Sequence, residues 1–235
     1  MVLSWRNGRK SVQNQVGIRS GEEEFMTVAV DLWADIVCPW CFIGKRRLQF
    51  AQEAVGIDTT VRHRAFQLDP SAANQGRRVV DVLAEKYRVS TAQAEEMMDN
   101  VTQVAASVGL TYRMDECLSG NTGDAHRLVL WAQEHGDGQA LVENLYTAYF
   151  TEGRSVFTID DLAPIAADSG LDAGAARSLL ATRAYVDDVA ADQRLAGELG
   201  ATGVPFFVLD GRLGVSGAQP QEVFEQALRQ VGQNA

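Results

Sequence analysis

The sequence predicts an α/β protein in which a long helical insertion divides a small mixed sheet into two parts. Three observations predict this fold class. A strand-like run, a helical segment and an alternating segment follow one another between residues 28 and 66. A stretch with mostly helical periodicity comes next and ends near residue 199. Two short strand-like runs and a last helix then close the chain.

The first part of the sheet is predicted from a strand, a helix and a second strand. Val28 to Ala34 is apolar and predicts a buried strand. Residues from Pro39 to about Val55 carry apolar side chains at helical spacing, and Thr59 to Phe66 alternates like a strand. In such a βαβ unit the segment after the first strand lies at the carboxyl end of the sheet, where open α/β proteins place their sites.

The helical insertion shows one clear start signal and several glycine boundaries. Ser90 and Gln93 form a capping-box pattern, and Gly109 closes the apolar stripe that follows. Helices are predicted at residues 79–87, 90–108, 121–131, 141–150, 158–168, 172–181 and 185–199.

The chain then returns to strands. Phe206 to Leu209 is apolar, Asp210-Gly211 is a two-residue hairpin signal, and Arg212 to Val215 pairs back. Gln219-Pro220 opens a last amphipathic helix. The element order βαβ, helices, ββα is that of a thioredoxin-like fold with a large all-helical insertion domain. We expect a thioredoxin-like domain over residues 27–75 and 200–235, and the insertion over 76–199.

Composition narrows the class of protein. The 235 residues have a formal net charge of −10, which argues against nucleic acid or an anionic membrane as a partner. No apolar run reaches the ~18 residues of a membrane span. Residues 1–25 lack apolar periodicity and the apolar centre of a secretory signal, so we expect a disordered extension. The expected compartment is the reducing cytosol, where paired cysteines tend to be catalytic or metal-binding.

The most informative motif is Cys38-Pro39-Trp40-Cys41, at the start of the first predicted helix. The unpaired N–H groups of a first helical turn and the helix dipole favour a thiolate there. A second cysteine one turn later can resolve a mixed disulfide. Pro39 fits the first turn because its missing N–H costs nothing there. We expect Cys38 to be the accessible thiol, Cys41 the more buried one, and Trp40 an exposed residue that contacts substrates.

Two other interpretations of the cysteine pair are weaker. A structural zinc site needs four ligands, and the remaining candidates, Cys117 and three histidines, form no second close pair. A purely structural disulfide would close only a four-residue loop, which restrains little of the unfolded chain. We therefore expect no metal, and we interpret Cys117 as a lone buried thiol.

A proline directly precedes the second strand pair, in Gly203-Val204-Pro205. A proline at a strand start is usually trans, and taken alone this one predicts a trans bond. Its combination with the cysteine pair, in this element order, favours a cis Val204–Pro205 bond. The backbone of Val204 would then face the dithiol and could pair with an extended substrate.

Several motifs together resemble one known family, the FrnE-type, DsbA-like thiol–disulfide oxidoreductases. The resemblance covers about residues 27–232 and is carried by Asp35-Ile-Val-Cys38-Pro39-Trp40-Cys41, Asn121-Thr122-x-x-Ala125-His126-Arg127, Gly203-Val204-Pro205-Phe206-Phe207 and Gly214-Val215-Ser216-Gly217-Ala218-Gln219. It implies a thioredoxin-like fold with a helical insertion and a cis Pro205. It also implies that Cys38 attacks the substrate and Cys41 resolves the intermediate.

The same superfamily includes kappa-class glutathione transferases and 2-hydroxychromene-2-carboxylate isomerases. These resemble the present chain but carry serine at the position of Cys38, and they use glutathione. A cysteine pair favours dithiol exchange over glutathione conjugation. Glutathione stays possible as a co-substrate, held by the Val204 backbone and the loop from Ser216 to Gln219.

Three polar residues near the predicted site have two interpretations each. Asp35 is either a turn residue that caps the helix or an aid to proton transfer at Cys41. Asn121 is an N-cap, a residue that faces the substrate across the domain boundary, or both. His126 is expected to be a packed helix residue, with contact to the thiols as the alternative.

We therefore expect a cytosolic thiol–disulfide oxidoreductase that acts on protein or small-thiol disulfides and needs no bound cofactor. One competing hypothesis is a glutathione-dependent isomerase or transferase. Another is a redox-sensing binding module or chaperone, in which replacement of Cys38 by serine would leave all function intact.

Overall fold

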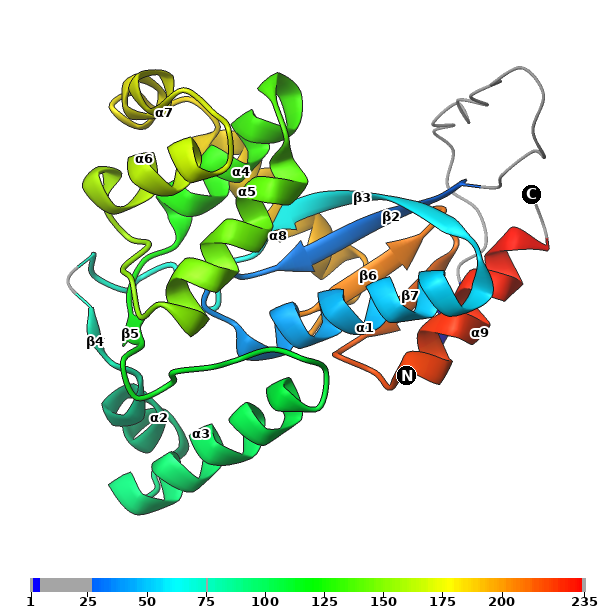
Figure 1. Cartoon of the computed structure of the whole chain (residues 1–235), viewed down its shortest axis with the longest axis horizontal. Coiled ribbons are helices and arrows are strands. Elements are labelled where there is room, and N and C mark those ends of the chain that lie inside the picture. Colours follow the sequence, from blue (N-terminus) through cyan, green and yellow to red (C-terminus); the bar gives the residue numbers. More distant parts are fainter. Residues whose placement is uncertain (1, 5–26, 75, 234–235) are drawn as a thin grey trace.

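The structure of the chain is a computed structural model that describes residues 2–4, 27–74 and 76–233. The predicted thioredoxin-like elements are all present in it, in the predicted order (Figure 1). They are β2 (Thr27–Ala34), α1 (Pro39–Val55), β3 (Asp58–Ala65), β6 (Phe206–Leu209), β7 (Leu213–Ser216) and α9 (Gln221–Gly232).

Together with β1 (Val2–Ser4), these strands form one mixed sheet with the order β1-β7-β6-β2-β3. β3 runs parallel to β2, with Val30 opposite Val61, as a βαβ unit requires. β6 is antiparallel to β2, and β7 is antiparallel to β6 across the predicted hairpin. Asp210 and Gly211 at the hairpin turn both have positive φ, which explains the choice of these residue types.

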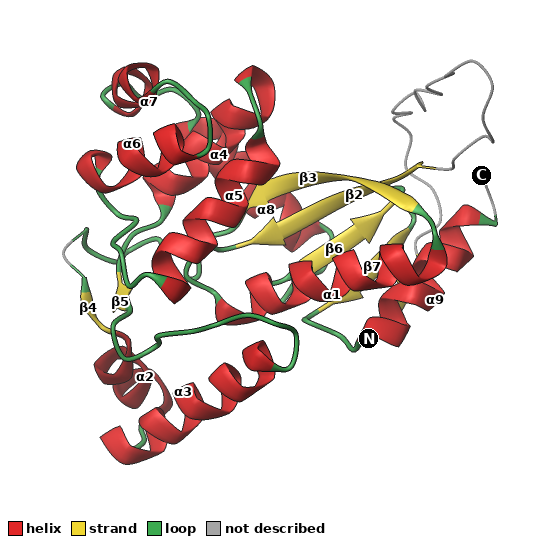
Figure 2. Cartoon of the chain, viewed as in Figure 1, coloured by secondary structure: helices red, strands yellow, loops and turns green. Residues whose placement is uncertain are grey.

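Helices cover both faces of the sheet (Figure 2). Val30 and Leu32 of β2 point into the main core, which also contains residues of α1 and α9. Trp33 points to the other face, where it packs with Phe206 and with Ala196 of α8 (Val186–Glu198). Because both faces are buried, β2 carries apolar side chains in both directions near its carboxyl end.

The insertion lies beside the carboxyl end of β2 and is built mainly of helices (Figure 1). Its capping box at Ser90 and Gln93 is present as predicted. The helices before α8 are α2 (Val79–Tyr87), α3 (Thr91–Ala106), α4 (Gly123–His135), α5 (Gly138–Tyr146), α6 (Ile159–Asp168) and α7 (Ala173–Leu180).

Two local features of the insertion were not predicted. Arg77–Arg78 (β4) and Leu118–Ser119 (β5) form a small antiparallel sheet. The segment Thr147–Thr151 continues α5 as a π-helical turn, where the sequence predicted a regular helix to residue 150. β4 and β5 have two residues each, which is too short for an alternating pattern that the sequence could reveal.

The domain boundaries at residues 75 and 200 stay predictions.

The expectation of disorder over residues 1–25 needs a correction at one point. Val2–Ser4 forms a short strand, β1, antiparallel to β7. Without it β7 would be an edge strand with unpaired backbone groups, which a short β-forming segment can satisfy. The rest of the expectation concerns residue 1 and residues 5–25, which lie outside the described residues. Among the helices that the structure describes, none is both long and apolar enough to cross a membrane.

Candidate functional site

The two cysteines of the Cys-Pro-Trp-Cys motif lie at the N-terminus of α1, just after β2 (Figure 1). Cys38 is the N-cap residue, and Pro39 is the first residue of the helix. The N–H of Cys38 donates to the carbonyl of Asp35 at 3.1 Å, and the N–H of Cys41 donates to the carbonyl of Cys38 at 3.0 Å. No side-chain hydrogen bond caps α1, so the positive end of the helix dipole at this terminus is left to favour a thiolate.

The two thiols differ in burial. Cys41 is completely buried, and Cys38 is 4% exposed. The order of burial is the expected one, but Cys38 is far less accessible than the sequence predicted, because the second strand pair and the insertion both cover it. Trp40, between them, is 42% exposed. Burial raises the pKa of Cys41 well above its usual value, and the neighbouring Cys38 thiol raises it further.

Pro205 stands where the sequence predicted it, at the entrance to β6, and its peptide bond with Val204 is cis. The Sγ of Cys38 lies 3.8 Å from the carbonyl oxygen of Val204. Two motifs that are 166 residues apart in the chain are therefore in contact. The predicted link between the cysteine pair and the proline is confirmed.

The loop after β7 supports the Val204–Pro205 segment. The N–H of Gly217 donates to the carbonyl of Pro205 at 2.8 Å. Ser216 precedes it at the end of β7, and its carbonyl accepts a hydrogen bond from the side chain of Gln219. Arg47 of α1 donates to the carbonyl of Ala218 at 2.6 Å, which ties the same loop to the helix of the dithiol. Ser216 and Val204 thus lie on one side of the site.

Asp35 is not the helix cap that one interpretation expected. Its carboxylate is buried, with 1% of the residue exposed. One oxygen accepts from the N–H of Leu68 at 2.7 Å. The other lies 3.2 Å from Nε2 of His126, which belongs to α4 of the insertion. His126 is therefore packed, as expected, and its Nε2 pairs with Asp35 rather than with a thiol.

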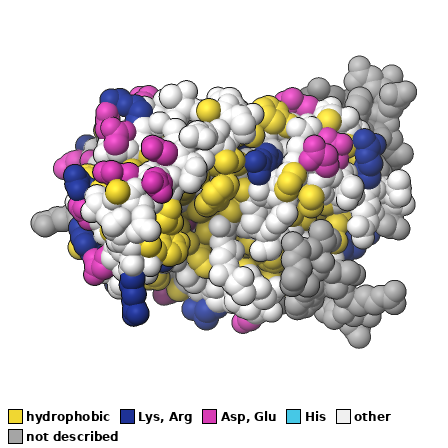
Figure 3. All heavy atoms as spheres, turned by 90° about the horizontal axis from the view of Figure 1, so that it is seen from below, with side chains coloured by type: hydrophobic (Ala, Val, Ile, Leu, Met, Phe, Trp, Pro, Cys, Tyr) yellow, Lys and Arg dark blue, Asp and Glu magenta, His cyan; other side chains and the backbone are white. Residues whose placement is uncertain are grey.

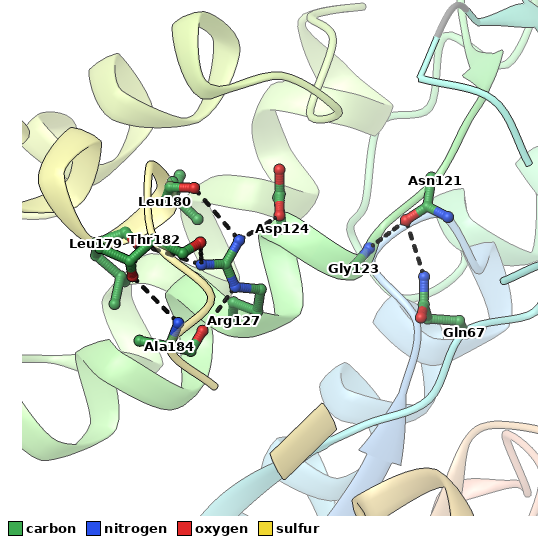
Figure 4. A network of polar contacts seen from close by, with 9 residues as sticks. All are labelled: Gln67, Asn121, Gly123, Asp124, Arg127, Leu179, Leu180, Thr182 and Ala184. Atoms are coloured by element: carbon green, nitrogen blue, oxygen red, sulfur yellow. Dashed lines mark hydrogen bonds and ion pairs between the residues drawn. The ribbon is translucent and has the colours of Figure 1, made fainter. Parts of the chain in front are cut away.

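Asn121 joins the insertion to the loop that follows β3. Its side-chain oxygen accepts from the N–H of Gly123 at 2.8 Å and from Nε2 of Gln67 at 3.1 Å, as Figure 4 shows. Its amide nitrogen donates to the carbonyl of Pro70. Asn121 is therefore not the N-cap, since α4 begins one residue later and its N-cap is Thr122. Its side chain still pairs with the N–H of the first helical residue, Gly123, and it bridges the two parts of the chain. Its role in substrate binding stays a prediction.

A pocket of about 450 Å³ opens beside this bridge. It lies between the start of α4, the loop after β3 and α8. Its polar lining residues include Gln67, Asp124, Arg127, Gln193 and Arg194. Arg127 does not offer its charge to the pocket, because its guanidinium already binds Asp124 and four carbonyl groups at the end of α7 (Figure 4).

Sequence reasoning missed the aromatic residues that enclose the dithiol. The hydroxyl of Tyr112 donates to the carbonyl of Pro39 at 2.8 Å. Phe42 of α1 stacks on Tyr146, with ring centroids 4.8 Å apart, and Phe150 stacks on Tyr112 at 4.5 Å. These tyrosines lie in the insertion, so the insertion forms one wall of the site. Their isolated positions in the sequence gave no signal of this role.

The third cysteine lies apart from the pair. Cys117 is buried next to the carbonyls of Arg113 and Tyr149. Burial raises its pKa to about 12, so it is an inert thiol near neutrality. Within the part of the chain that the structure describes, no group of three or more His, Cys, Asp or Glu side chains could hold a metal ion.

We compared the sequence of the chain with models of known protein families. The model of the DSBA-like thioredoxin domain matches residues 29–229, a range that includes both halves of the sheet and the insertion. The chain belongs to the DSBA-like thioredoxin domain family.

The alignments with two relatives cover most of the chain. The crystal structure of a probable DsbA oxidoreductase from Streptomyces coelicolor is 46% identical, with a TM-score of 0.81, and the match covers 86% of this chain and 89% of that one. The uncharacterized protein YwbO of Bacillus subtilis is 29% identical over 205 residues, which are 86% of this chain and 96% of YwbO.

More distant structures share the fold alone. A 2-hydroxychromene-2-carboxylate isomerase is 18% identical with a TM-score of 0.66, and the match covers 88% of this chain and 97% of the isomerase. The cytosolic disulfide reductase DsbM of Pseudomonas aeruginosa is 21% identical with a TM-score of 0.59, and the match covers 88% of this chain and all of DsbM. The DSBA-like scaffold with its helical insertion is thus common to proteins of different activity.

Proposed function

We propose that this member of the family exchanges disulfides with its substrates through Cys38 and Cys41. One observation carries the proposal: the two thiols stand one turn apart at a helix N-terminus without a side-chain cap, and the backbone carbonyl of Val204 lies 3.8 Å from the Sγ of Cys38. A dithiol needs such a geometry to form a mixed disulfide and then release it.

The exchange proceeds in two steps. The thiolate of Cys38 attacks a substrate disulfide, forms a bond to one of its sulfurs, and releases the other substrate sulfur as a thiolate. Cys41 then loses its proton and attacks Cys38, so that the Cys38–Cys41 disulfide forms and the second substrate thiol departs. The substrate gains two electrons and the protein loses them. In the opposite direction the same steps oxidise a substrate dithiol.

The surroundings of the dithiol favour polypeptide substrates. The backbone of Val204 offers a donor and an acceptor to an extended strand. Trp40 is exposed beside Cys38, and Leu68, Met97 and Leu118 are other large apolar residues left exposed. Figure 3 shows hydrophobic side chains in a band across the middle of one face, with most charged side chains on either side of it. Unfolded or partly folded chains supply the apolar segments that such a surface attracts.

Glutathione fits this proposal as a small-thiol co-substrate. The loop from Ser216 to Gln219 and the backbone of Val204 lie together at the site, and a γ-glutamyl peptide is short enough to span them. DsbM, which shares the fold, has been solved with glutathione. Because a second cysteine follows Cys38, a bound glutathione would be exchanged rather than retained for an isomerase or transferase reaction.

Trapping of the intermediate tests the proposed function. Reduced Cys41→Ala protein, incubated with a disulfide-containing protein such as insulin, should accumulate a mixed disulfide at Cys38. Cys38→Ala should form none, and the matched variant Cys117→Ala should turn over like the unaltered chain. If Cys38→Ala retains full activity towards its partners, the chain is a binding module or chaperone and the proposal is wrong.

A further inference from the structure

The loop that follows α3 reaches the helix of the dithiol through one hydroxyl group. This loop passes the N-terminus of α1 in Figure 1. Tyr112 of the loop is 6% exposed, and its hydroxyl donates to the carbonyl oxygen of Pro39 at 2.8 Å. Burial raises the pKa of this hydroxyl, so it keeps its proton wherever thiols react. The insertion thus places a permanent hydrogen-bond donor on a carbonyl between the two cysteines.

The π-helical turn at the end of α5 holds Tyr112 in this position. The residues on either side of Tyr112 are both bonded to the turn. The N–H of Arg113 donates to the carbonyl of Phe150 at 2.7 Å, and the hydroxyl of Thr151 donates to the carbonyl of Thr111 at 2.7 Å. The last carbonyls of a helix lack helical partners, so the carbonyl of Phe150 can accept here. Turns of this type are often found at functional sites, and this one supports Tyr112.

The hydrogen bond of Tyr112 acts on a peptide group that faces Cys38. The carbonyl of Pro39 and the N–H of Trp40 belong to the same peptide group. Trp40 is the second residue of α1, so its N–H has no acceptor within the helix, and the side chain of the N-cap residue, Cys38, is the usual partner of such a group. A hydrogen bond to a carbonyl polarises its peptide group and makes the N–H of that group a stronger donor.

The thiol of Cys38 lies at a different acceptor in the structure. Its Sγ is 3.8 Å from the carbonyl oxygen of Val204, to which a protonated thiol can donate, and it makes no cap bond to α1. A thiolate has no proton to donate and is repelled by a carbonyl oxygen. Ionisation of Cys38 therefore favours a turn of its sulfur from Val204 towards the N–H of Trp40.

We propose that Tyr112 is a positioning residue that stabilises the thiolate of Cys38 through the Pro39–Trp40 peptide group, and that the π-helical turn holds Tyr112 in place. The inference rests on the proposed dithiol exchange, in which this thiolate attacks the substrate. Tyr112 transfers no proton, and the bonds that form and break in the exchange are unchanged. It raises the ionised fraction of Cys38 and so favours the reduced protein over the disulfide.

Other charged or ionisable side chains lie around Cys38 and Tyr112. Tyr112→Phe removes a neutral hydroxyl and changes none of their charges, so a shift in the ionisation of Cys38 would come from the lost hydrogen bond. These side chains come from α1, from the segment before it, and from the insertion. They are Asp35, Cys41, Arg46, Arg47, Cys117, His126, Glu143 and Tyr146.

The test compares two substitutions of the same kind. Tyr112→Phe removes the hydroxyl that reaches Pro39. Tyr149→Phe is the control, because its hydroxyl belongs to the same aromatic cluster but donates to the carbonyl of Leu118. The rate at which iodoacetamide alkylates Cys38 in each reduced protein is measured by peptide mass spectrometry from pH 5 to 9. Division by the plateau rate at high pH gives the fraction of thiolate. The equilibrium of each protein with glutathione at pH 7 is the second measurement.

Tyr112→Phe should lower the thiolate fraction of Cys38 by about twofold to fourfold below the midpoint of the profile. This factor follows because cooperativity strengthens a charge-assisted hydrogen bond by roughly 10–30%. The equilibrium with glutathione should move towards the Cys38–Cys41 disulfide by up to the same factor, and Tyr149→Phe should match the unaltered chain. An unchanged normalised profile in Tyr112→Phe, whatever its plateau rate, or equal shifts in both variants, would overturn the inference.

A second variant decides if Tyr112→Phe does not fold. Thr151→Val removes the bond to Thr111 and leaves the tyrosine in place. It should shift the profile in the same direction by a smaller factor, and no shift would overturn the inference. The proposed function fails separately, if the unaltered chain forms no Cys38–Cys41 disulfide with glutathione.

Discussion

Gly44 of α1 packs directly against Pro205. A Cβ atom placed on Gly44 would lie 3.0 Å from Cγ of Pro205 and 3.2 Å from the ring of Phe207. It would also lie 3.5 Å from Cα of Ala218, in the loop after β7. The absence of a side chain at Gly44 therefore sets how closely the helix of the dithiol approaches the Val204–Pro205 segment.

Gly44→Ala should destabilise the protein and slow the exchange. Helix propensity alone would favour alanine by about 1 kcal/mol. Overpacking against a rigid proline ring costs about 1–3 kcal/mol, so the net change in the free energy of unfolding should be a loss of about 1 kcal/mol. Chemical denaturation measures it. Gly197→Ala in α8 is the control, because a Cβ there meets no atom within 4 Å; it should stabilise the protein, and equal effects of the two variants would contradict the packing argument.

Arg127 should be irreplaceable by lysine. Its guanidinium donates to Asp124 and to the carbonyls of Leu179, Leu180, Thr182 and Ala184, which end α7 and lead into α8. A lysine has one nitrogen and cannot reach this set of acceptors. Arg127→Lys should lower the free energy of unfolding by about 3 kcal/mol, since several buried carbonyls lose a charged donor.

Thermal or urea unfolding checks this prediction, with Arg194→Lys as the control. Arg194 lies on the exposed side of α8 and lines the same pocket. A loss below about 0.5 kcal/mol for Arg127→Lys, the range of ordinary surface changes, would show that the guanidinium network carries little stability.

Much of this fold could be predicted from the sequence because its elements are locally specified. The helix of the dithiol has the predicted bounds, Pro39–Val55, since it starts at a proline and ends at Gly56, which has positive φ. The β6–β7 hairpin and the capping box at Ser90 carry equally local signals. The contact of Cys38 with Val204 could be predicted because the element order brings both segments to the same end of the sheet, where β2 ends and β6 begins.

The rest of the site depends on contacts between distant parts of the chain. His126 meets Asp35 across 91 residues, and Tyr112 meets Pro39 across 73. Each of His126 and Tyr112 is a single polar side chain in an otherwise apolar helix or loop. Its spacing from the neighbouring apolar residues is that of any packed residue, so the sequence does not indicate its partner. The packing of the insertion against the sheet decides which of these side chains face the thiols. The same packing buries Cys38, which its position at a helix start did not indicate.

His63 should make stability depend on pH below neutrality. Burial lowers its pKa from 6.5 to about 4, so it is neutral in the folded protein where it is charged in the unfolded chain. The unfolded chain binds more protons between these values, and stability falls as the pH falls. The loss should reach about 3 kcal/mol between pH 7 and pH 4.

Urea unfolding across this range checks the effect of His63. His63→Gln should flatten the pH dependence by about that amount, and His135→Gln, at an exposed position, should leave it unchanged. The same slope in His63→Gln and in the unaltered chain would show that other groups produce it.

The two thiols should differ in their reaction with an alkylating agent. Cys41 is completely buried, so the reagent cannot reach it, and its raised pKa keeps it protonated near pH 7.5. Cys38, at the helix N-terminus, should be alkylated first, and Cys41 and Cys117 only when the pH is raised or the chain is unfolded. Peptide mass spectrometry after timed quenching gives the order. Labelling of Cys41 before Cys38 would reverse their assigned roles.

The central claim is that Cys38 and Cys41 form one reversible redox couple. A titration of the protein against mixtures of reduced and oxidised glutathione, quenched by acid and read by mass spectrometry, tests it most directly. We expect a single two-electron transition in which the Cys38–Cys41 disulfide appears while Cys117 stays a thiol. Its midpoint should lie within the range of about −270 to −120 mV known for related dithiols. A stable glutathione adduct on Cys38 without closure to Cys41, or a disulfide that includes Cys117, would contradict it.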